Sequence, residues 1–235
     1  IFGTNEESGF RGIKWYAANE ETPVAGFTPD IPEGIVHAEK GGLHIRIDVP
    51  VRDKGAIDLA SFQAGEAVNI VPDLCEAVFR GEQAVLQAWA EVLRRAVGTM
   101  TLGGEVIFEK GNLTIRAFGK AAHASLPENG ENAIAALCRL IDANPPPGGA
   151  LGAFRVLSGL LEDPRFGSTL GIAMADDVSG PLTCNPGRAF FSKGILSVDL
   201  DIRHPVTVKG DQVVERLRGK LATLDLVPVE TSRYS

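Results

Sequence analysis

The stretch LHIRIDVPV, residues 43–51, alternates apolar and polar side chains, and this period of two predicts a β-strand with one buried face. Further strands are predicted at residues 35–38, 75–79, 105–109, 112–118, 189–192 and 195–202. Apolar residues at helical spacing predict helices over residues 9–21, 82–97, 131–143, 151–162 and 212–224. The order strand, helix, strand, strand, helix occurs twice, which predicts an α+β fold of two lobes built on antiparallel sheets.

The composition is that of a globular protein with a substantial core, because 44% of the 235 residues are hydrophobic and 23% are charged. A net charge of -7 without a cluster of lysine or arginine argues against a nucleic-acid partner. No apolar run approaches the roughly 20 residues of a membrane-spanning helix, which argues against a membrane protein. Cys75, Cys138 and Cys184 are widely spaced and odd in number, so we expect reduced, buried thiols and a cytoplasmic location.

Two adjacent carboxylates, Glu6 and Glu7, lie on the glycine-bounded run GTNEESG at residues 3–9. Such a pair suits metal-dependent hydrolysis, because one carboxylate can hold a metal ion while the other handles a proton. The run is equally typical of a capped helix start with acidic residues near the positive helix end. Asp30, in GFTPD at residues 26–30, is either a third carboxylate of the same site or a residue that caps a turn.

His123 lies among small residues in GKAAHASLP, residues 119–127, and small neighbours keep an imidazole accessible to a substrate. A histidine in the core would more often have bulky apolar neighbours. Arg203 follows a predicted strand, where a guanidinium can hold a carboxylate in a bidentate manner, or it is a surface arginine at a strand end. Asn69 is either a turn residue or an amide donor near a ligand.

Five segments together resemble the dinuclear zinc peptidases of the aminoacylase and carboxypeptidase G superfamily, with the bacterial PepV-like (Xaa-His, carnosinase-like) dipeptidases as the nearest group. The segments are GTNEESG (3–9), GFTPD (26–30), NIVPD (69–73), GKAAHASLPENGENAI (119–134) and DIRHPV (201–206). The resemblance implies that residues 1–38 are the terminal piece of an α/β catalytic domain. It also implies that residues 39–235 form a lid, with lobes at about 39–118 and 119–235 that can interleave.

The resemblance also implies roles for single residues. Glu6 would be the general base, Glu7 would bind one metal ion, and Asp30 would bind the other. His123 would stabilise the tetrahedral oxyanion. The two remaining candidates, Asn69 and Arg203, would bind the substrate. The implied metal is zinc, two ions per intact enzyme, and carboxylate ligands also accept manganese or cobalt. The implied reaction is hydrolysis of the peptide bond of dipeptides or short peptides by a metal-activated water.

The superfamily's His-x-Asp motif and its late metal-binding histidine have no counterpart in this chain. We therefore expect this segment to bind catalytic metal weakly or not at all and to be inactive in isolation. Two other functions are compatible with the sequence, a non-catalytic binding or oligomerisation module and an amidohydrolase that acts on N-acyl amino acids. A lid of two lobes can substitute for a dimer contact, so a monomer is favoured and a dimer stays open.

Overall fold

The computed structural model describes residues 11–26, 38–52, 55–147 and 151–234. The chain divides into two compact units, Ile1–His37 and Ala38–Ser235. Helix α1 (Arg11–Asn19) lies in the first unit, and none of its side chains is buried. The core of the protein therefore belongs to the second unit.

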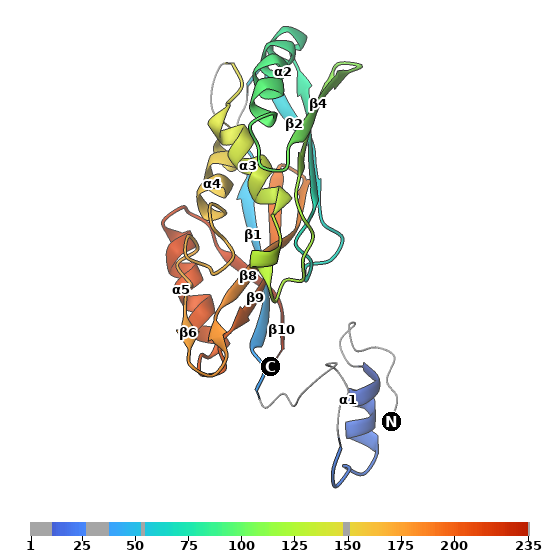
Figure 1. Cartoon of the computed structure of the whole chain (residues 1–235), viewed down its shortest axis with the longest axis vertical. Helices are drawn as coiled ribbons and strands as arrows, with labels where there is room; N and C mark the ends of the chain where they lie inside the picture. Colours follow the sequence, from blue (N-terminus) through green and yellow to red (C-terminus); the bar gives the residue numbers. More distant parts are fainter. Residues whose placement is uncertain (1–10, 27–37, 53–54, 148–150, 235) are drawn as a thin grey trace. The chain divides into compact units, whose positions relative to one another are not determined.

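The second unit contains every other described element (Figure 1). In chain order these are β1 (Gly41–Pro50), β2 (Ile57–Ala64), β3 (Leu74–Gly81), α2 (Gln83–Val97), β4 (Gly104–Glu109), β5 (Asn112–Phe118), the 3-10 turn η1 (Pro127–Asn129), α3 (Ala133–Ala143), α4 (Gly152–Leu160), β6 (Ala175–Asp176), β7 (Gly180–Pro181), β8 (Thr183–Ser192), β9 (Ile195–His204), α5 (Gly210–Ala222) and β10 (Pro228–Tyr234). None of the helices in the described ranges has the length and apolar character needed to cross a membrane.

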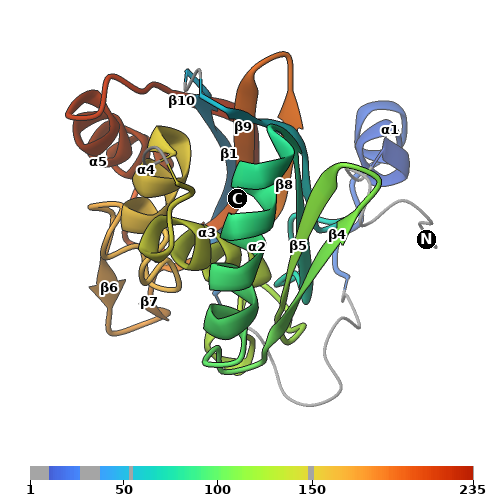
Figure 2. The same ribbon diagram turned by 90° about the horizontal axis from the view of Figure 1, so that it is seen from above.

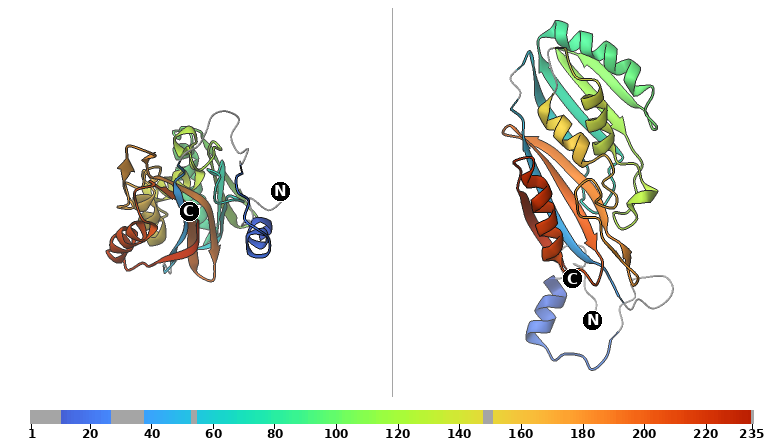
Figure 3. Two further views of the ribbon diagram at one scale, coloured as in Figure 1. Left: turned by 90° about the horizontal axis from the view of Figure 1, so that it is seen from below. Right: turned by 90° about the vertical axis from the view of Figure 1, so that its left-hand side faces the viewer.

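Eight strands form one antiparallel sheet in the order β10-β1-β9-β8-β2-β3-β5-β4, and β6 pairs with β7 in a separate ribbon. Helices α2 to α5 lie on one face of this sheet, as the right-hand view of Figure 3 shows. Seen from above in Figure 2, α4 and α5 are on the β1 side, and α2 is on the β4–β5 side. The α+β class and the antiparallel pairing are as predicted from the sequence.

Alternation along β1 explains where the core lies. Its apolar residues Leu43, Ile45 and Ile47 are at most 1% exposed and face the helices. Burial at helical spacing on α2 brings Trp89 onto Phe79 of β3, with ring centroids 4.9 Å apart in an edge-to-face contact. Burial of each such side chain contributes roughly 1.5–3 kcal/mol. The core therefore fills the layer between helices and sheet and leaves the other face of the sheet for polar residues.

The three cysteines are free and buried, as the sequence predicted. Burial raises the pKa of all three thiols, to about 12 for Cys138, because desolvation disfavours the thiolate. They are therefore inert packing residues rather than nucleophiles.

The sheet differs from the prediction of a separate sheet for each lobe. A short contact between β2 and β8, over the pairs Gln63↔Phe190 and Ala64↔Ala189, joins all eight strands. The sequence analysis omitted β2, because a register shift between Leu59 and Ser61 interrupts its alternation. It also omitted β10, an exposed polar strand that is defined only by its pairing with β1.

The predicted start of one strand was also wrong. Strand β8 begins at Thr183 rather than at residue 189, since Pro186 and the residue after it look like a turn but lie at a bulge in the strand. Of the strand predicted at residues 35–38, Ala38 is not in a strand and the other residues lie outside the described ranges.

Candidate functional site

Three of the predicted site residues, Glu6, Glu7 and Asp30, lie outside the described residues. The other predicted site residues all belong to the second unit. Within the described ranges, no group of three or more His, Cys, Asp or Glu side chains is arranged to hold a metal ion.

The loop that carries His123 is closed at its base by two backbone hydrogen bonds between Lys120 and Glu131, of 2.9 and 3.0 Å. Near its tip, His123 lies opposite Ile70 in an antiparallel bridge. The amide of the residue after His123 donates to the carbonyl oxygen of Asn69 at 2.9 Å, and a second bond of 2.8 Å flanks the pair on the other side. Two predicted site residues that are distant in sequence, Asn69 and His123, are therefore neighbours on hydrogen-bonded segments.

The imidazole of His123 is exposed, as predicted, and its orientation follows from its contacts with Ser125. The backbone N–H of Ser125 donates to Nδ1 at 3.2 Å, and the Ser125 hydroxyl oxygen lies 2.6 Å from the same nitrogen. A backbone N–H can only donate, so Nδ1 is an acceptor and neutral His123 carries its proton on Nε2. His123 can thus present an N–H donor to a ligand from the ring nitrogen opposite Ser125.

A pair of asparagines, buried Asn185 and partly buried Asn132, holds the turn that contains Asn69. The amide nitrogen of Asn185, which is 1% exposed, donates to the carbonyls of Val68 and Ile70 at 3.0 and 2.9 Å, one on each side of Asn69. Its side-chain oxygen accepts from the amide of Asn132 at 3.3 Å. The oxygen of Asn132 in turn caps α3 by accepting from two backbone N–H groups of its first turn. The pair therefore ties the turn, β8 and the end of the His123 loop together.

Arg203 lies near the end of β9, opposite Thr183 of β8. Its Nε is 3.4 Å from Oδ1 of Asp201, and the two side chains are 23% and 0% exposed. Oδ2 of Asp201 and the hydroxyl of Thr183 are buried without a hydrogen-bond partner among the described residues. Arg203 is therefore a largely covered guanidinium held by a carboxylate. Asp201 was not among the predicted site residues, although the alternation in the run DLDIRH places it on the same face of the strand as Arg203.

Lys40 was also not among the predicted site residues, and it interacts with both the Arg203 region and the His123 loop. Its ammonium donates to the carbonyl of Pro181 at 2.5 Å. Burial lowers the pKa of Lys40, and the charge of Arg203 adds to that effect, whereas Glu128 and Asp176 oppose it. Lys40 thus interacts electrostatically both with Arg203 and with Glu128 in η1, which is part of the His123 loop. Its position directly before the first strand is the feature of the sequence that could have marked Lys40 as a candidate.

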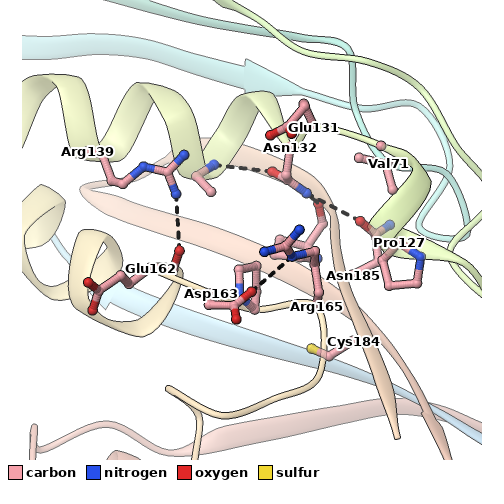
Figure 4. A pocket seen from close by; sticks show the side chains of 14 residues that line it. Val71, Pro127, Glu131, Asn132, Arg139, Glu162, Asp163, Arg165, Cys184 and Asn185 are labelled. Carbon is pink, nitrogen blue, oxygen red and sulfur yellow. Dashed lines mark hydrogen bonds and ion pairs between the residues drawn. The ribbon is translucent and has the colours of Figure 1, made fainter. Parts of the chain in front are cut away.

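A cavity of about 260 Å³ borders the asparagine pair (Figure 4). Arg139 reaches from α3 to the carbonyl oxygen of Glu162, and Asp163 pairs with Arg165 at 3.0 Å. These side chains have mixed charge, and the cavity contains none of the predicted site residues. We therefore assign it no ligand and regard it as space beside the asparagine pair.

Three sequence matches connect this chain with known proteins. The peptidase dimerisation domain of the M20 family matches residues 109–189. YtjP of Bacillus subtilis (strain 168), described as a candidate dipeptidase, is 34% identical over 215 residues, which are 89% of this chain and 46% of that protein. The beta-Ala-Xaa dipeptidase of Lactobacillus delbrueckii subsp. lactis is 27% identical over 224 residues, which are 94% of this chain and 47% of that protein.

A solved structure, that of the aminoacylhistidine dipeptidase from Vibrio alginolyticus, aligns with a TM-score of 0.34 at 11% identity. The alignment covers 83% of this chain and 44% of that chain. The chain spans about half the length of the curated relatives it matches.

Proposed function

We propose that this chain forms a substrate-binding lid that serves metal-dependent dipeptide hydrolysis. It carries the M20 peptidase dimerisation domain and is homologous to bacterial dipeptidases. The observation that carries this proposal is the hydrogen-bonded contact between the Asn69 turn and the His123 loop. It brings an amide and an exposed imidazole, from segments far apart in sequence, onto one rigid support.

In this proposal His123 donates from Nε2 to the oxyanion that forms when the scissile carbonyl is attacked. The fixed acceptor role of Nδ1 supports this assignment, because it keeps the donor on the other nitrogen. A donor aimed at charge that develops in the transition state acts on kcat rather than on ground-state binding. Asn69 would supply a second donor beside it.

Arg203 would bind the C-terminal carboxylate of the substrate. A guanidinium matches a carboxylate in bidentate fashion, and the covered position of Arg203 strengthens the charge interaction relative to open water. A free C-terminus would then favour short peptides as substrates.

The metal-binding part of the proposal rests on the donor chemistry of Glu7 and Asp30. Carboxylate oxygens suit zinc, manganese and cobalt, and we assign one of the two residues to each of two zinc ions, together with ligands from outside this chain. When bound, the metals would polarise the scissile carbonyl and lower the pKa of water. Glu6, their neighbour, would accept the proton of that water as general base.

The test is hydrolysis of a free dipeptide by the complete gene product, before and after treatment with a chelator. His123→Ala should lower kcat about 10²–10³-fold with little change in KM, because one oxyanion donor is lost. Lys120→Ala removes an exposed side chain of the same loop and should leave kcat unchanged. A His123→Ala enzyme with normal kcat would contradict the proposed role.

The alternative substrate class and the oligomeric state can each be tested. An N-acyl amino acid carries the same free carboxylate as a dipeptide, so hydrolysis rates on the two substrate classes distinguish an amidohydrolase from a dipeptidase. The match to a dimerisation domain supports an oligomer rather than the monomer favoured from the sequence. Light scattering of the complete gene product measures that state directly.

A further inference from the structure

Asp201 is a carboxylate buried in the middle of the sheet. Its side chain is 0% exposed, and its Oδ2 has no hydrogen-bond partner among the described residues. Nε of Arg203 lies 3.4 Å from Oδ1, and Nε2 of His44 lies 3.7 Å from Oδ2. A buried charge with an unsatisfied oxygen opposes folding unless it is well paired. Stability of the fold alone therefore gives no reason for a carboxylate at this position.

The contact with Asp201 leaves the far end of Arg203 open. Only Nε of the guanidinium has a hydrogen bond or ion pair within the described part of the chain. The two terminal nitrogens stay available for a ligand, and a carboxylate can accept from both of them at once. Asp201 thus holds Nε of the guanidinium, while the two terminal nitrogens have no partner in the described part of the chain.

The neighbouring pair Asp199 and Arg46 shows the contrasting arrangement. Asp199 lies two residues before Asp201, on the same strand and the same face. It accepts from two nitrogens of Arg46, at 2.7 and 3.1 Å, and the ring of Phe190 lies 4.9 Å from that guanidinium. Arg46 is therefore occupied by its partner in a closed pair, whereas Arg203 is held at one point.

Asp201 is itself fixed from both sides. It lies directly opposite His44 of β1 and Asn185 of β8 in the strand register. The amide of Asn185 is committed to the turn around Asn69 and to Asn132, so it does not compete for the carboxylate. The position of Arg203 relative to the Asn69 turn is therefore set by adjacent residues of one sheet.

We propose that Asp201 is a positioning residue that orients Arg203 for the carboxylate of the substrate. The proposal rests on the proposed function, in which Arg203 binds that carboxylate. Asp201 itself touches no substrate. Its effect should appear only with substrates that have the carboxylate, and it should disappear when Arg203 can no longer form a fork.

The experiment compares the complete wild-type enzyme with Asp201→Asn, and with Asp199→Asn as the matched control. Each is assayed on a dipeptide with a free C-terminus and on the same dipeptide as its C-terminal amide. Asp201→Asn should raise KM for the free acid about tenfold, the scale of one charge-assisted hydrogen bond, while KM for the amide and kcat stay near wild type. Asp199→Asn should keep the wild-type ratio of the two KM values.

A further variant tests whether Asp201 acts through the arginine. Arg203→Lys keeps the charge but loses the fork, so it should raise KM for the free acid by itself. Adding Asp201→Asn to Arg203→Lys should then cause little further rise. A second full rise in the double variant would overturn the proposal.

The outcomes separate the two levels of the argument. Asp201→Asn with the wild-type preference for the free acid overturns the positioning role and leaves the proposed function intact. A wild-type enzyme that prefers neither substrate overturns the role of Arg203 and, with it, that of Asp201. Absence of dipeptide hydrolysis by the wild type overturns the proposed function itself. Should Asp201→Asn fail to fold, Asp201→Ser takes its place with the same expected ratio.

Discussion

Replacing Asn185 by alanine should destabilise the second unit by about 2–4 kcal/mol and loosen the Asn69 turn from the His123 loop. The side chain is 1% exposed and makes two donor bonds to backbone carbonyls and one acceptor bond to Asn132. At about 1 kcal/mol per buried hydrogen bond, the three sum to roughly 3 kcal/mol. The cavity beside Asn185 can admit water to the freed carbonyls, which keeps the loss from growing much larger.

Two measurements test this value. Chemical denaturation of the chain gives the change in the free energy of unfolding. Amide hydrogen exchange at Val71 and Ala124 reports the two bonds that join the turn to the loop, and both should exchange faster in the variant. Asn112→Ala is the matched control, because its side chain makes only exposed hydrogen bonds, accepting from Arg80 and donating to the carbonyl of Lys110, and its cost should stay within about 0.5 kcal/mol.

An Asn185→Ala variant that loses less than about 1 kcal/mol and protects both amides as the wild type does would mean that the turn is held by its backbone contacts alone. The asparagine pair would then have no positioning role. Faster exchange at both amides without global destabilisation would instead support the positioning role of the asparagine pair and lower only the expected change in the free energy of unfolding.

Three further predictions concern individual side chains. Ile70 is 46% exposed and paired with His123. Ile70→Ala should therefore lower kcat/KM roughly tenfold for dipeptides with a large apolar side chain, and less for glycine dipeptides. Equal losses on both kinds of dipeptide would contradict this. Hydrogen bonds hold the pKa of Asp176 well below its unfolded value, so its stabilisation is present above about pH 4 and is lost as pH falls toward the folded pKa. Asp176→Asn should therefore lower the melting temperature more at pH 7 than at pH 2, and a constant difference would count against it. Zinc titration should show weak binding, because Glu7 and Asp30 are two ligands where zinc takes about four; a tight stoichiometric isotherm would overturn this.

Local patterns predicted most individual elements correctly. The hairpin of β4 and β5 follows from Lys110 and Gly111, which both adopt positive φ, of 51° and 77°, in a two-residue turn. The buried stripe of α2 follows from helical spacing around Trp89. Such elements are specified by neighbours within a few positions, and that information is present in a single sequence.

Long-range pairing could not be predicted in this way. Whether two lobes have separate sheets depends on the two residue pairs between β2 and β8, and no local pattern encodes that contact. Strand β10 has few buried side chains, so its sequence carries almost no strand signal before β1 is placed beside it. The loss of alternation at a bulge hid β2 for a related reason.

The same distinction applies to the site. The accessibility of His123 followed from the small residues around it, but its proximity to Asn69 required the bridge to Ile70. Asp201 and Lys40 were missed because their surroundings come from other segments, His44 and Asn185 for Asp201 and the carbonyl of Pro181 for Lys40. A charged residue on a strand acquires a role only when the register decides what lies beside it.

That register explains how distant parts of the site are kept in one geometry. Asn185, which holds the Asn69 turn, and Asp201, which holds Arg203, are direct partners across β8 and β9. Opposed residues on one face of an antiparallel pair keep their Cβ atoms about 4.5–5.5 Å apart, and a slip of one residue would turn both side chains into the core. The apolar phase of the same strands forbids such a slip, because it would expose Leu200 and Ile202, each 0% exposed. The hydrophobic core thus fixes the spacing of the proposed substrate-binding residues without containing any of them.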